Sequence, residues 1–297
     1  MRRLILEEPV SQVALWSRRL ALFALTLALF GVILARSAAI EVAAALAVFG
    51  SSILIACTAL LFAAAGSVVI WRTGRRGVLA IIAATLLALG FLAWPAWLGL
   101  TAVRLPLLND VSTDINDPPQ FSQSEAARSA RSGKQFAAVS EFVRLEQQRA
   151  YPDVQPIIID LEAGEVYELA LEAARSLGWT IIEQDEPLEE KMITPERPPA
   201  PKPVFVTRGG KRVRVVPPRP PAPKAYKQEA RDGRIEAYAR TPVMGFPDDI
   251  TIRIRALPDQ ARVDIRSVSR YGRHDFGANA KRIRQFAAAL QEQLDSE

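Results

Sequence analysis

Three long uncharged segments between Leu20 and Val103 constrain the fold of this chain more than any other feature of the sequence. The two longer segments, residues 42–71 and 77–103, exceed the roughly 20 apolar residues that a helix needs to cross about 30 Å of hydrocarbon. The first segment, residues 20–35, is shorter, but the long side chains of the flanking arginines can reach the headgroups and extend its span. The sequence therefore predicts a membrane anchor, residues 1–104, with three transmembrane helices.

The positions of the arginines predict the orientation of the anchor, because short cytoplasmic loops collect Lys and Arg. Arginines are frequent in the amino-terminal tail and in the second loop, residues 72–76, whereas the first loop holds Arg36 opposed by Glu41. The tail and the second loop are therefore expected in the cytoplasm. Three crossings then place the rest of the chain outside, which in a bacterium means a multi-pass inner-membrane protein with a periplasmic carboxy-terminal domain. A cleaved signal peptide is the alternative for the first segment, but the two segments that follow favour an uncleaved anchor.

Charge and cysteine content exclude several classes of protein. Glu41 is the only acidic residue between Leu20 and Val103, so the spans lack the ionisable groups of a transport path. The single cysteine, Cys57, lies within the second span, so no disulfide is expected in the external part. The net charge of +5 comes from residues 1–104, which hold nine arginines and three glutamates, while the external part is near neutral. Nucleic-acid binding is therefore not expected.

Beyond the anchor, the composition predicts a linker at residues 105–122 and an external α+β domain at residues 123–297, with a proline-rich insertion at about 187–226. The linker is rich in Asn, Asp, Ser and Pro, which is typical of an extended tether. Three of its aspartates could suggest a calcium site, namely Asp110, Asp114 and Asp117. Their spacing lacks the alternation and the central glycine of a calcium-binding loop, so a solvated tether is the preferred interpretation.

Hydrophobic periodicity predicts the secondary structure of the domain. Apolar residues at spacings of three and four predict helices over residues 134–149 and 165–177, and Gly178 is placed to end the second helix in a left-handed conformation. Apolar extended segments predict short strands at residues 157–159 and 179–183.

Three later segments alternate apolar and polar residues with a period of two. They are residues 234–241, 249–257 and 262–269. In the middle segment Ile250, Ile252 and Ile254 share one face, and charged or polar residues occupy the other, which predicts an antiparallel sheet with helices on its apolar face. A last helix, capped by Asp275, is expected to cover this face. Its predicted buried stripe consists of Phe276, Ala280, Ile283, Ala287, Leu290 and Leu294.

The insertion has a composition of its own, because about half of the chain's 21 prolines lie between Pro187 and Pro223. Within it, the sequence VFVTRGGKRVRVV places two β-rich runs around Gly209 and Gly210, a pattern typical of a tight hairpin. We interpret the insertion as a basic two-stranded finger. It is either a projection without a partner, or an arm that docks on an acidic partner or on the acidic helix of its own domain.

Four stretches of the external part resemble one known family. They are LNDVSTDINDPP, YPDVQPI, GFPDDITIRIR and RVDIRSVSRYGRHDFGANAKRIRQF. Together they resemble the bacterial and plastid family of domain of unknown function DUF1499, over most of residues 107–290, and the proline-rich finger departs from the family pattern. The resemblance implies a compact α+β domain, often carried on membrane spans, and it implies no reaction because the family has no established activity.

The last of these stretches is a candidate anion site. Basic and amide side chains crowd the turn before the last helix, where positive charge opposes the helix dipole. The candidate residues are Arg266, Arg270, Arg273, Asn279 and Arg282. With the backbone N–H groups of residues 276–278, they would form a site for a phosphate or a carboxylate. The alternative is that the arginines pair with carboxylates across the charged face of the sheet, namely those of Asp248, Asp249, Asp264 and Glu236.

Catalysis has weaker support in the sequence. The residue types of a serine hydrolase are present in Ser267 or Ser269, His274 and Asp275, but His274 and Asp275 are neighbours in the chain and the aspartate serves better as a helix cap. Adjacent carboxylates at residues 248–249 are expected to point to opposite sides of a strand, and one histidine with no external cysteine does not suggest zinc or any other cofactor.

We therefore expect a non-enzymatic envelope protein in contact with membrane lipid, whose external domain binds an anionic envelope component or a partner protein. A hydrolase that acts on envelope material is the alternative.

Overall fold

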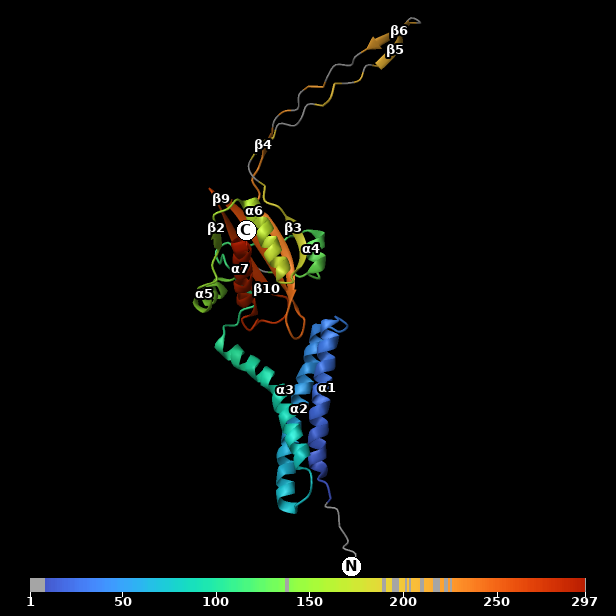
Figure 1. Cartoon of the computed structure of the whole chain (residues 1–297), viewed down its shortest axis with the longest axis vertical. Helices are drawn as coiled ribbons and strands as arrows, with labels where there is room; N and C mark the ends of the chain where they lie inside the picture. The colour runs from blue at the N-terminus through green and yellow to red at the C-terminus, as the bar shows by residue number, and fades with distance from the viewer. Residues whose placement is uncertain are drawn as a thin grey trace, which may run out of the picture.

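The computed structural model describes residues 9–136, 139–188 and 226–296, together with the short stretches 191–193, 198–200, 202, 204–208, 211–215, 220–221 and 224. Three long helices form one end of the molecule, an α+β domain follows, and a two-stranded hairpin lies at the opposite end (Figure 1). The predicted fold class, three apolar helices followed by an antiparallel sheet with helices, is confirmed.

The three long helices are α1 (Gln12–Arg36), α2 (Val42–Thr73) and α3 (Val78–Arg104). Each is long and apolar enough to cross a membrane, with mean hydropathies of 1.9, 2.5 and 2.2. Small side chains let helix backbones approach closely, and alanines from all three helices form a buried cluster. Pro95 interrupts the hydrogen bonding of α3, and Figure 1 shows the last part of this helix bent away from α1 and α2.

The domain is organised around a six-stranded antiparallel sheet. Its strands lie in the order β1, β10, β9, β8, β3, and β2 also pairs with β10. They are β1 (Asp110–Ser112), β2 (Ile157–Ile159), β3 (Thr180–Asp185), β8 (Gly233–Arg240), β9 (Pro247–Leu257) and β10 (Gln260–Ser269). The three long neighbours β8, β9 and β10 agree with the predicted segments to within two residues at each end.

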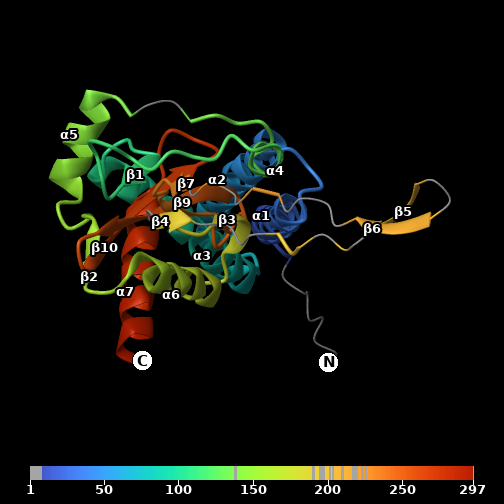
Figure 2. The ribbon, with the colours of Figure 1, turned by 90° about the horizontal axis from the view of Figure 1, so that it is seen from above.

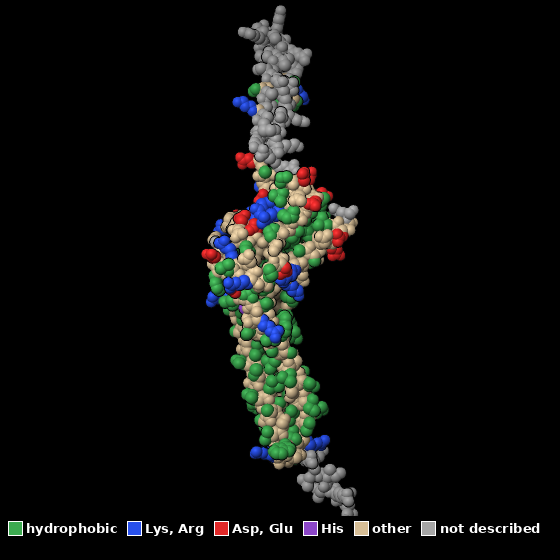
Figure 3. Space-filling view, turned by 90° about the vertical axis from the view of Figure 1, so that its left-hand side faces the viewer, with side chains coloured by type: hydrophobic (Ala, Val, Ile, Leu, Met, Phe, Trp, Pro, Cys, Tyr) green, Lys and Arg blue, Asp and Glu red, His purple; other side chains and the backbone are tan. Residues whose placement is uncertain are grey.

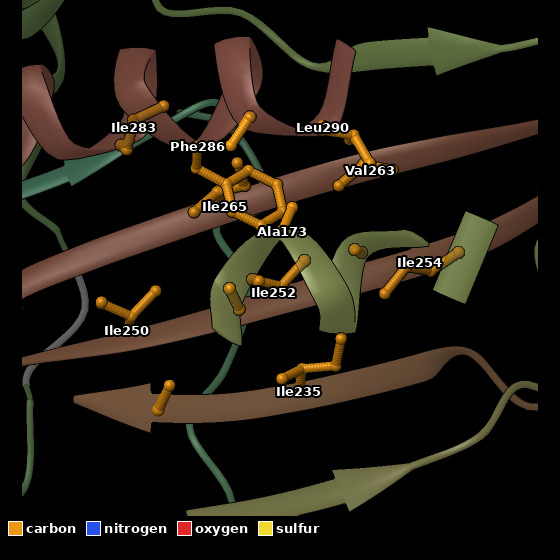
Figure 4. Packing of buried hydrophobic residues seen from close by; sticks show 14 of the residues in the cluster. Ala173, Ile235, Ile250, Ile252, Ile254, Val263, Ile265, Ile283, Phe286 and Leu290 are labelled. Atoms are coloured by element: carbon orange, nitrogen blue, oxygen red, sulfur yellow. The ribbon is translucent and has the colours of Figure 1, made fainter. Parts of the chain in front are cut away.

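Two helices cover the apolar face of the sheet, α6 (Ala163–Ser176) and α7 (Ala278–Ser296), as Figure 2 shows from above. Alternating apolar residues point toward them and are fully buried, namely Ile250, Ile252 and Ile254 of β9 and Val263 and Ile265 of β10 (Figure 4). Gly178 follows α6 with φ of +71°, as predicted. Trp179 then stacks on Phe286 of α7, with ring centroids 5.5 Å apart.

The predicted stripe of the last helix is wrong at two positions. Phe276 precedes α7 instead of lying in it, and its side chain is 40% exposed. Phe286, rather than Ala287, fills the space above the sheet and is fully buried. The helix begins two residues later than the predicted stripe, because Phe276 and Gly277 have left-handed backbones, with φ of +54° and +79°. Asp275 caps the helix, as predicted, by accepting hydrogen bonds from the N–H groups of Gly277 and Asn279.

The prediction of a solvated tether before the domain is wrong. Residues 110–112 form β1, which pairs with β10, and Leu108, Val111 and Phe121 are buried. The following residues cross the second face of the sheet, where α4 (Glu125–Ala130) also lies (Figure 2). The charged face of the sheet is therefore covered by protein rather than by water.

Ion pairs hold this covering segment in place. Asp264, on β10, has a side chain with no exposed surface and accepts hydrogen bonds from Arg253, Arg255 and Arg262 at 2.6 to 3.0 Å. The same three arginines bind Asp114, the nearest at 2.6 Å. The aspartates considered for calcium are thus bound to arginines, Asp117 to Arg253 and Asp110 to Arg266.

The predicted helix over residues 134–149 is shorter in the structure. Helix α5 (Glu141–Ala150) begins only after Ser140, whose hydroxyl accepts a hydrogen bond from the N–H of Val143. Phe136 lies outside it and packs on Phe121, with ring centroids 4.8 Å apart. Gln147 of α5 is buried and bonds to both the N–H and the C=O of Ser112 through its amide, at 3.1 and 2.6 Å. The amide of Gln147 thus makes the hydrogen bonds that a neighbouring strand would make at the outer edge of β1.

The insertion contains the predicted finger. Strand β5 (Val204–Arg208) pairs with β6 (Lys211–Val215), and β4 (Lys191–Ile193) pairs with β7 (Tyr226–Gln228) nearer the domain. The predicted turn, residues 209–210, lies outside the described residues. Figure 1 shows β5 and β6 beyond the domain, at the end opposite α1–α3.

The domain contacts the anchor through the loop between β8 and β9. Arg36, the last residue of α1, donates a hydrogen bond to the carbonyl of Pro242 at 2.6 Å. Met244 of this loop packs with Ala35 and Ala45 in a small apolar cluster. The ends of β8, β10 and α6 and the start of α7 therefore all face the anchor.

Candidate anion-binding site

Three of the predicted anion-site arginines already bind carboxylates. Arg266 donates through Nε and Nη2 to both oxygens of Asp110, at 3.0 and 2.7 Å. Arg270 binds Asp249 in the same way, at 2.7 and 2.6 Å. Two parallel bonds between a guanidinium and a carboxylate are among the strongest polar contacts in proteins, so these two arginines are committed to the fold.

Arg282 belongs to a buried polar network at the start of α7. It donates to Asp248 at 2.6 Å and to the hydroxyl of Ser267 at 2.9 Å. Asn279 accepts a hydrogen bond from Ser267 and donates one to Ser269, at 2.8 and 3.1 Å. Burial raises the pKa of Asp248, although the charge of Arg282 and the hydroxyl of Ser269 oppose this rise. The network links β9, β10 and α7 and leaves neither serine exposed.

The backbone groups predicted to hold the anion also have partners within the chain. The N–H of Phe276 donates to Nδ1 of His274 at 2.9 Å, and that of Gly277 to Asp275 at 2.8 Å. The N–H of Ala278 donates to the carbonyl of Asp275 at 3.0 Å. Anion binding by this set of residues stays a prediction, and the geometry favours the alternative in which the arginines pair with carboxylates.

The catalytic residue types do not assemble into a triad. Among the described residues, no hydrogen bond joins His274 to Ser267 or Ser269: Nδ1 of the histidine accepts the N–H of Phe276, and Nε2 is buried and has no hydrogen-bond partner. The two carboxylate oxygens of Asp275 accept backbone N–H groups at the start of α7. The geometry therefore gives no support to a serine nucleophile activated by this histidine.

Three exposed cations of the domain, on the side that faces the anchor, remain without a carboxylate partner. Within the described part of the chain, Arg240, Arg273 and Lys281 form no ion pair, and all three are exposed. Arg240 donates to the carbonyl of Gly245 at 3.0 Å, and its guanidinium lies 5.7 Å from the ring centre of Tyr238. An unpaired guanidinium or ammonium group remains available to bind an anion.

Two of these cations line one hollow of about 380 Å³ between the end of α6, the end of β8 and the first turns of α7. Its walls include Trp179, Tyr238, Arg240, Lys281, Arg282 and Gln285. No acidic residue is among the described residues that line it. We call this hollow the cationic pocket.

The cationic pocket lies at the end of the domain that faces the membrane helices. Pro242, which also lines it, accepts the hydrogen bond from Arg36 at the end of α1. Figure 3 shows Lys and Arg side chains on the lower part of the domain, next to the hydrophobic surface of the helices. A molecule in the pocket would therefore lie close to the surface of the membrane that the helices are suited to cross.

Sequence reasoning placed Arg282 near this site but did not identify Arg240. The end of β8 is about 40 residues from the start of α7, so no local pattern marks the two as neighbours. One signal could have identified Arg240 as an unpaired cation: no acidic residue lies opposite it on the described strands that pair with β8.

A second hollow of about 440 Å³ is less suited to anions. It is lined by Lys134, Arg270 and Asp110 among others, and the latter two are already paired. Lys134 donates to the carbonyl of Arg270, and its ammonium group lies 3.8 Å from the ring centre of Tyr271. Burial and the nearby charge of Arg270 lower the pKa of Lys134, so its charge is less stable there than in water.

Comparison with known families gives one result. A family model described as protein of unknown function, DUF1499, matches residues 110–290. The match starts at the first strand and ends within the last helix, so it covers the α+β domain and not the three apolar helices. Neither the curated proteins nor the solved structures provide a match.

Proposed function

Because the chain belongs to the DUF1499 family, for which no reaction is known, we propose from the geometry alone that its α+β domain binds an anionic envelope component. The proposed site is the cationic pocket, and the proposed ligand carries a phosphate or a carboxylate. In this proposal α1–α3 cross the inner membrane of a bacterium, the amino terminus is cytoplasmic and the domain is periplasmic.

The observation that carries the proposal is the pair Arg240 and Lys281. Both line the cationic pocket, neither has a carboxylate partner among the described residues, and no described acidic residue lies between them. The volume of about 380 Å³ is within the range of small-molecule sites, which is roughly 300 to 1,000 Å³. It suits a headgroup or a sugar acid, with Trp179 and Tyr238 as apolar walls.

The arrangement of charges supports the proposed orientation. Arg72, Arg75 and Arg76 cluster at the α2–α3 connection, as expected for a cytoplasmic loop. The domain instead contacts the α1–α2 connection through the bond from Arg36 to Pro242. With three crossings these two ends of the helix bundle lie on opposite sides of the membrane, so the domain belongs to the side without the arginine cluster.

The test is crosslinking in intact cells with a photoreactive amino acid at Gln285, which lines the cationic pocket. Gln291, the same residue type on an exposed part of the same helix, provides the control position. We expect an anionic lipid or glycan to be captured at residue 285 and not at residue 291. Equal capture at both positions, or capture of neutral molecules only, would contradict the proposal.

Charge removal gives the matching prediction. The double variant Arg240→Gln with Lys281→Gln is expected to weaken binding at the pocket, and so capture at residue 285, at least about a hundredfold, since it removes two charge-assisted bonds worth roughly 1.5 to 3 kcal/mol each. Arg284→Gln is the control, because Arg284 is exposed on the same helix and pairs with Asp153. Capture should be unchanged in this control.

A partner protein is the second candidate, and the finger favours it. An isolated two-stranded hairpin is only marginally stable in water, and β5 and β6 pair with no other described strand. The finger's sequence is basic, so an acidic protein is the expected partner. A photoreactive amino acid at Arg208 would then recover a protein, whereas recovery of none would remove this candidate. No observation favours a hydrolase.

A further inference from the structure

The loop between β10 and α7 lies against the chain that leaves α3. The N–H of Asp275 donates to the carbonyl of Leu108 at 2.8 Å, and the side chain of Asn109 donates to the carbonyl of Gly272 at 3.0 Å. A Cβ atom at Gly277 would lie 2.9 Å from Leu105, which directly follows the last residue of α3. Residues 271–276, which we call the interfacial loop, are therefore fixed beside the end of a helix suited to cross a membrane.

The interfacial loop and its neighbour expose apolar and basic side chains together. Phe276, Tyr271 and Leu107 are 40%, 37% and 57% exposed. Arg273, in the loop, and Arg104, at the end of α3, are also exposed and form no ion pair within the described part of the chain. Aromatic rings partition to the level of the headgroups, and arginines bind lipid phosphates there, so this combination matches the chemistry of a membrane surface.

The backbone of Phe276 is strained. Its φ is +54°, in the left-handed region that a bulky residue rarely adopts. Two contacts with His274 hold this conformation, a hydrogen bond from the N–H of Phe276 and a ring stack at 4.7 Å. Backbone strain is concentrated at functional sites, and an apolar partner for the exposed ring of Phe276 would account for the strain here.

We propose that the interfacial loop inserts into the headgroup layer of the leaflet at the end of α3. Phe276 and Tyr271 reach the boundary with the acyl chains, and Arg273 binds the phosphates of anionic phospholipids. The loop thereby attaches the domain to the lipid itself, in addition to the chain connection through α3 and the bond from Arg36 to Pro242, and holds the domain at a fixed height above the bilayer. This inference does not depend on a ligand in the cationic pocket.

The test places a fluorescent label at the loop in the full chain. Cys57 is first replaced by serine, and then either Phe276→Cys or Leu257→Cys supplies the only thiol. Leu257 is the control, because its side chain is also 40% exposed but lies at the far end of β9 from the anchor. The labelled proteins are reconstituted in nanodiscs of phosphatidylglycerol and phosphatidylcholine, with and without bromine on the acyl chains.

We expect brominated lipid to quench the label at residue 276 at least about twofold more than the label at residue 257. Aqueous iodide should show the reverse order. Equal quenching of both labels by iodide, with no effect of bromine on either, would overturn the proposal. If the Phe276→Cys protein does not fold, Tyr271→Cys replaces it with the same expected outcomes.

The role of charge is tested by lipid composition. Quenching of the label at residue 276 should increase with the fraction of phosphatidylglycerol, and Arg273→Gln should remove this dependence without changing thermal unfolding in detergent. Arg284→Gln, which changes an exposed arginine already paired with Asp153, should retain it. Dependence on phosphatidylglycerol that persists in Arg273→Gln would refute the part assigned to Arg273.

Discussion

Arg131 and Glu236 form a buried ion pair between the covering segment and the sheet. Their side chains are 2% and 1% exposed, and Nη1 of the arginine lies 2.7 Å from the carboxylate. The guanidinium also donates to the carbonyl of Ser122, whose N–H donates to Glu236. Burial raises the pKa of Glu236, although the Ser122 N–H and the charge of Arg131 oppose this rise.

Arg131→Met is expected to lower the free energy of unfolding at neutral pH by about 3 to 5 kcal/mol, because it leaves the charge of Glu236 buried without a partner. Because its pKa is raised in the folded protein, Glu236 contributes its full stabilisation below its unfolded pKa of 4.5. This stabilisation is lost as pH rises through the folded-state pKa. Removing Arg131 raises that pKa further, so the deficit should grow with pH.

Hydrogen exchange of the β8 amides in detergent measures this deficit. An equal deficit at about pH 4 and about pH 7 would show that Glu236 is not ionised in the folded protein. Glu125→Gln, on the exposed surface of α4, is a control expected to change little at either pH.

Single residue pairs were only partly predictable. The sequence proposed carboxylate partners for the arginines of the last stretch, and Arg270 and Arg282 do bind Asp249 and Asp248. The partner of Arg266 is Asp110 instead, about 150 residues earlier, because the segment before the domain joins the sheet as β1. The composition of residues 105–122 is typical of a tether, so it gave no sign of an ion pair with a distant strand.

At the scale of elements, Asp114 fixes the segment that covers the polar face. Its carboxylate accepts the N–H groups of Asn116 and Asp117, at 3.1 and 2.9 Å, and binds Arg262 at 2.6 Å. Burial alone would raise the pKa of Asp114, but the N–H of Asp117 and the charge of Arg262 together lower it.

Asp114→Asn is therefore expected to destabilise the segment by about 1.5 to 3 kcal/mol at neutral pH. Because its pKa is lowered, Asp114 stabilises the folded protein above its unfolded pKa of 3.8, and this stabilisation is lost as pH falls through the folded-state pKa. The stabilities of the variant and the parent should therefore converge in acid. Exchange of the amide of Thr113 reports this change. A difference that widens in acid would contradict the assigned sign.

Removing the finger should leave the domain intact. Ile193 and Tyr226 are register partners at the ends of β4 and β7, so a two-residue Asn-Gly turn can replace residues 194–225. Since β5 and β6 pair only with each other among the described strands, the free energy of unfolding should change by less than about 0.5 kcal/mol. Cooperative thermal unfolding at a clearly lower temperature would show that the finger supports the core.

Elements with long periodic patterns were predictable, and short ones were not. The alternation in β8, β9 and β10 and the spacing in α6 gave boundaries close to those observed. Strand β1 and helix α4 are short and polar. Strand β10 and Gln147 supply the hydrogen bonds of β1, and Ser122 and Arg131, which flank α4, bond to Glu236. The helix predicted over residues 134–149 begins later in the structure, because the hydroxyl of Ser140 caps it there and outweighs the apolar spacing of the residues before it.

At the scale of the whole molecule, the domain is attached to the anchor at two places. Arg36 bonds to the loop between β8 and β9, and the interfacial loop bonds to residues 108–109. Both contacts lie at the same end of the helix bundle, and the cationic pocket opens beside them. The three helices and the domain were predictable from hydropathy and periodicity, but the pocket was not, because the ends of three separate elements form it.

The central claim is that three crossings leave the α+β domain outside the cytoplasm, with its pocket at the membrane surface. Alkaline phosphatase, which is active only after export, tests this claim when it is fused behind Glu297. We predict an active fusion there and an inactive one after Gly74, in the connection between α2 and α3. An inactive phosphatase behind Glu297, together with a fluorescent cytoplasmic reporter at the same position, would contradict the account.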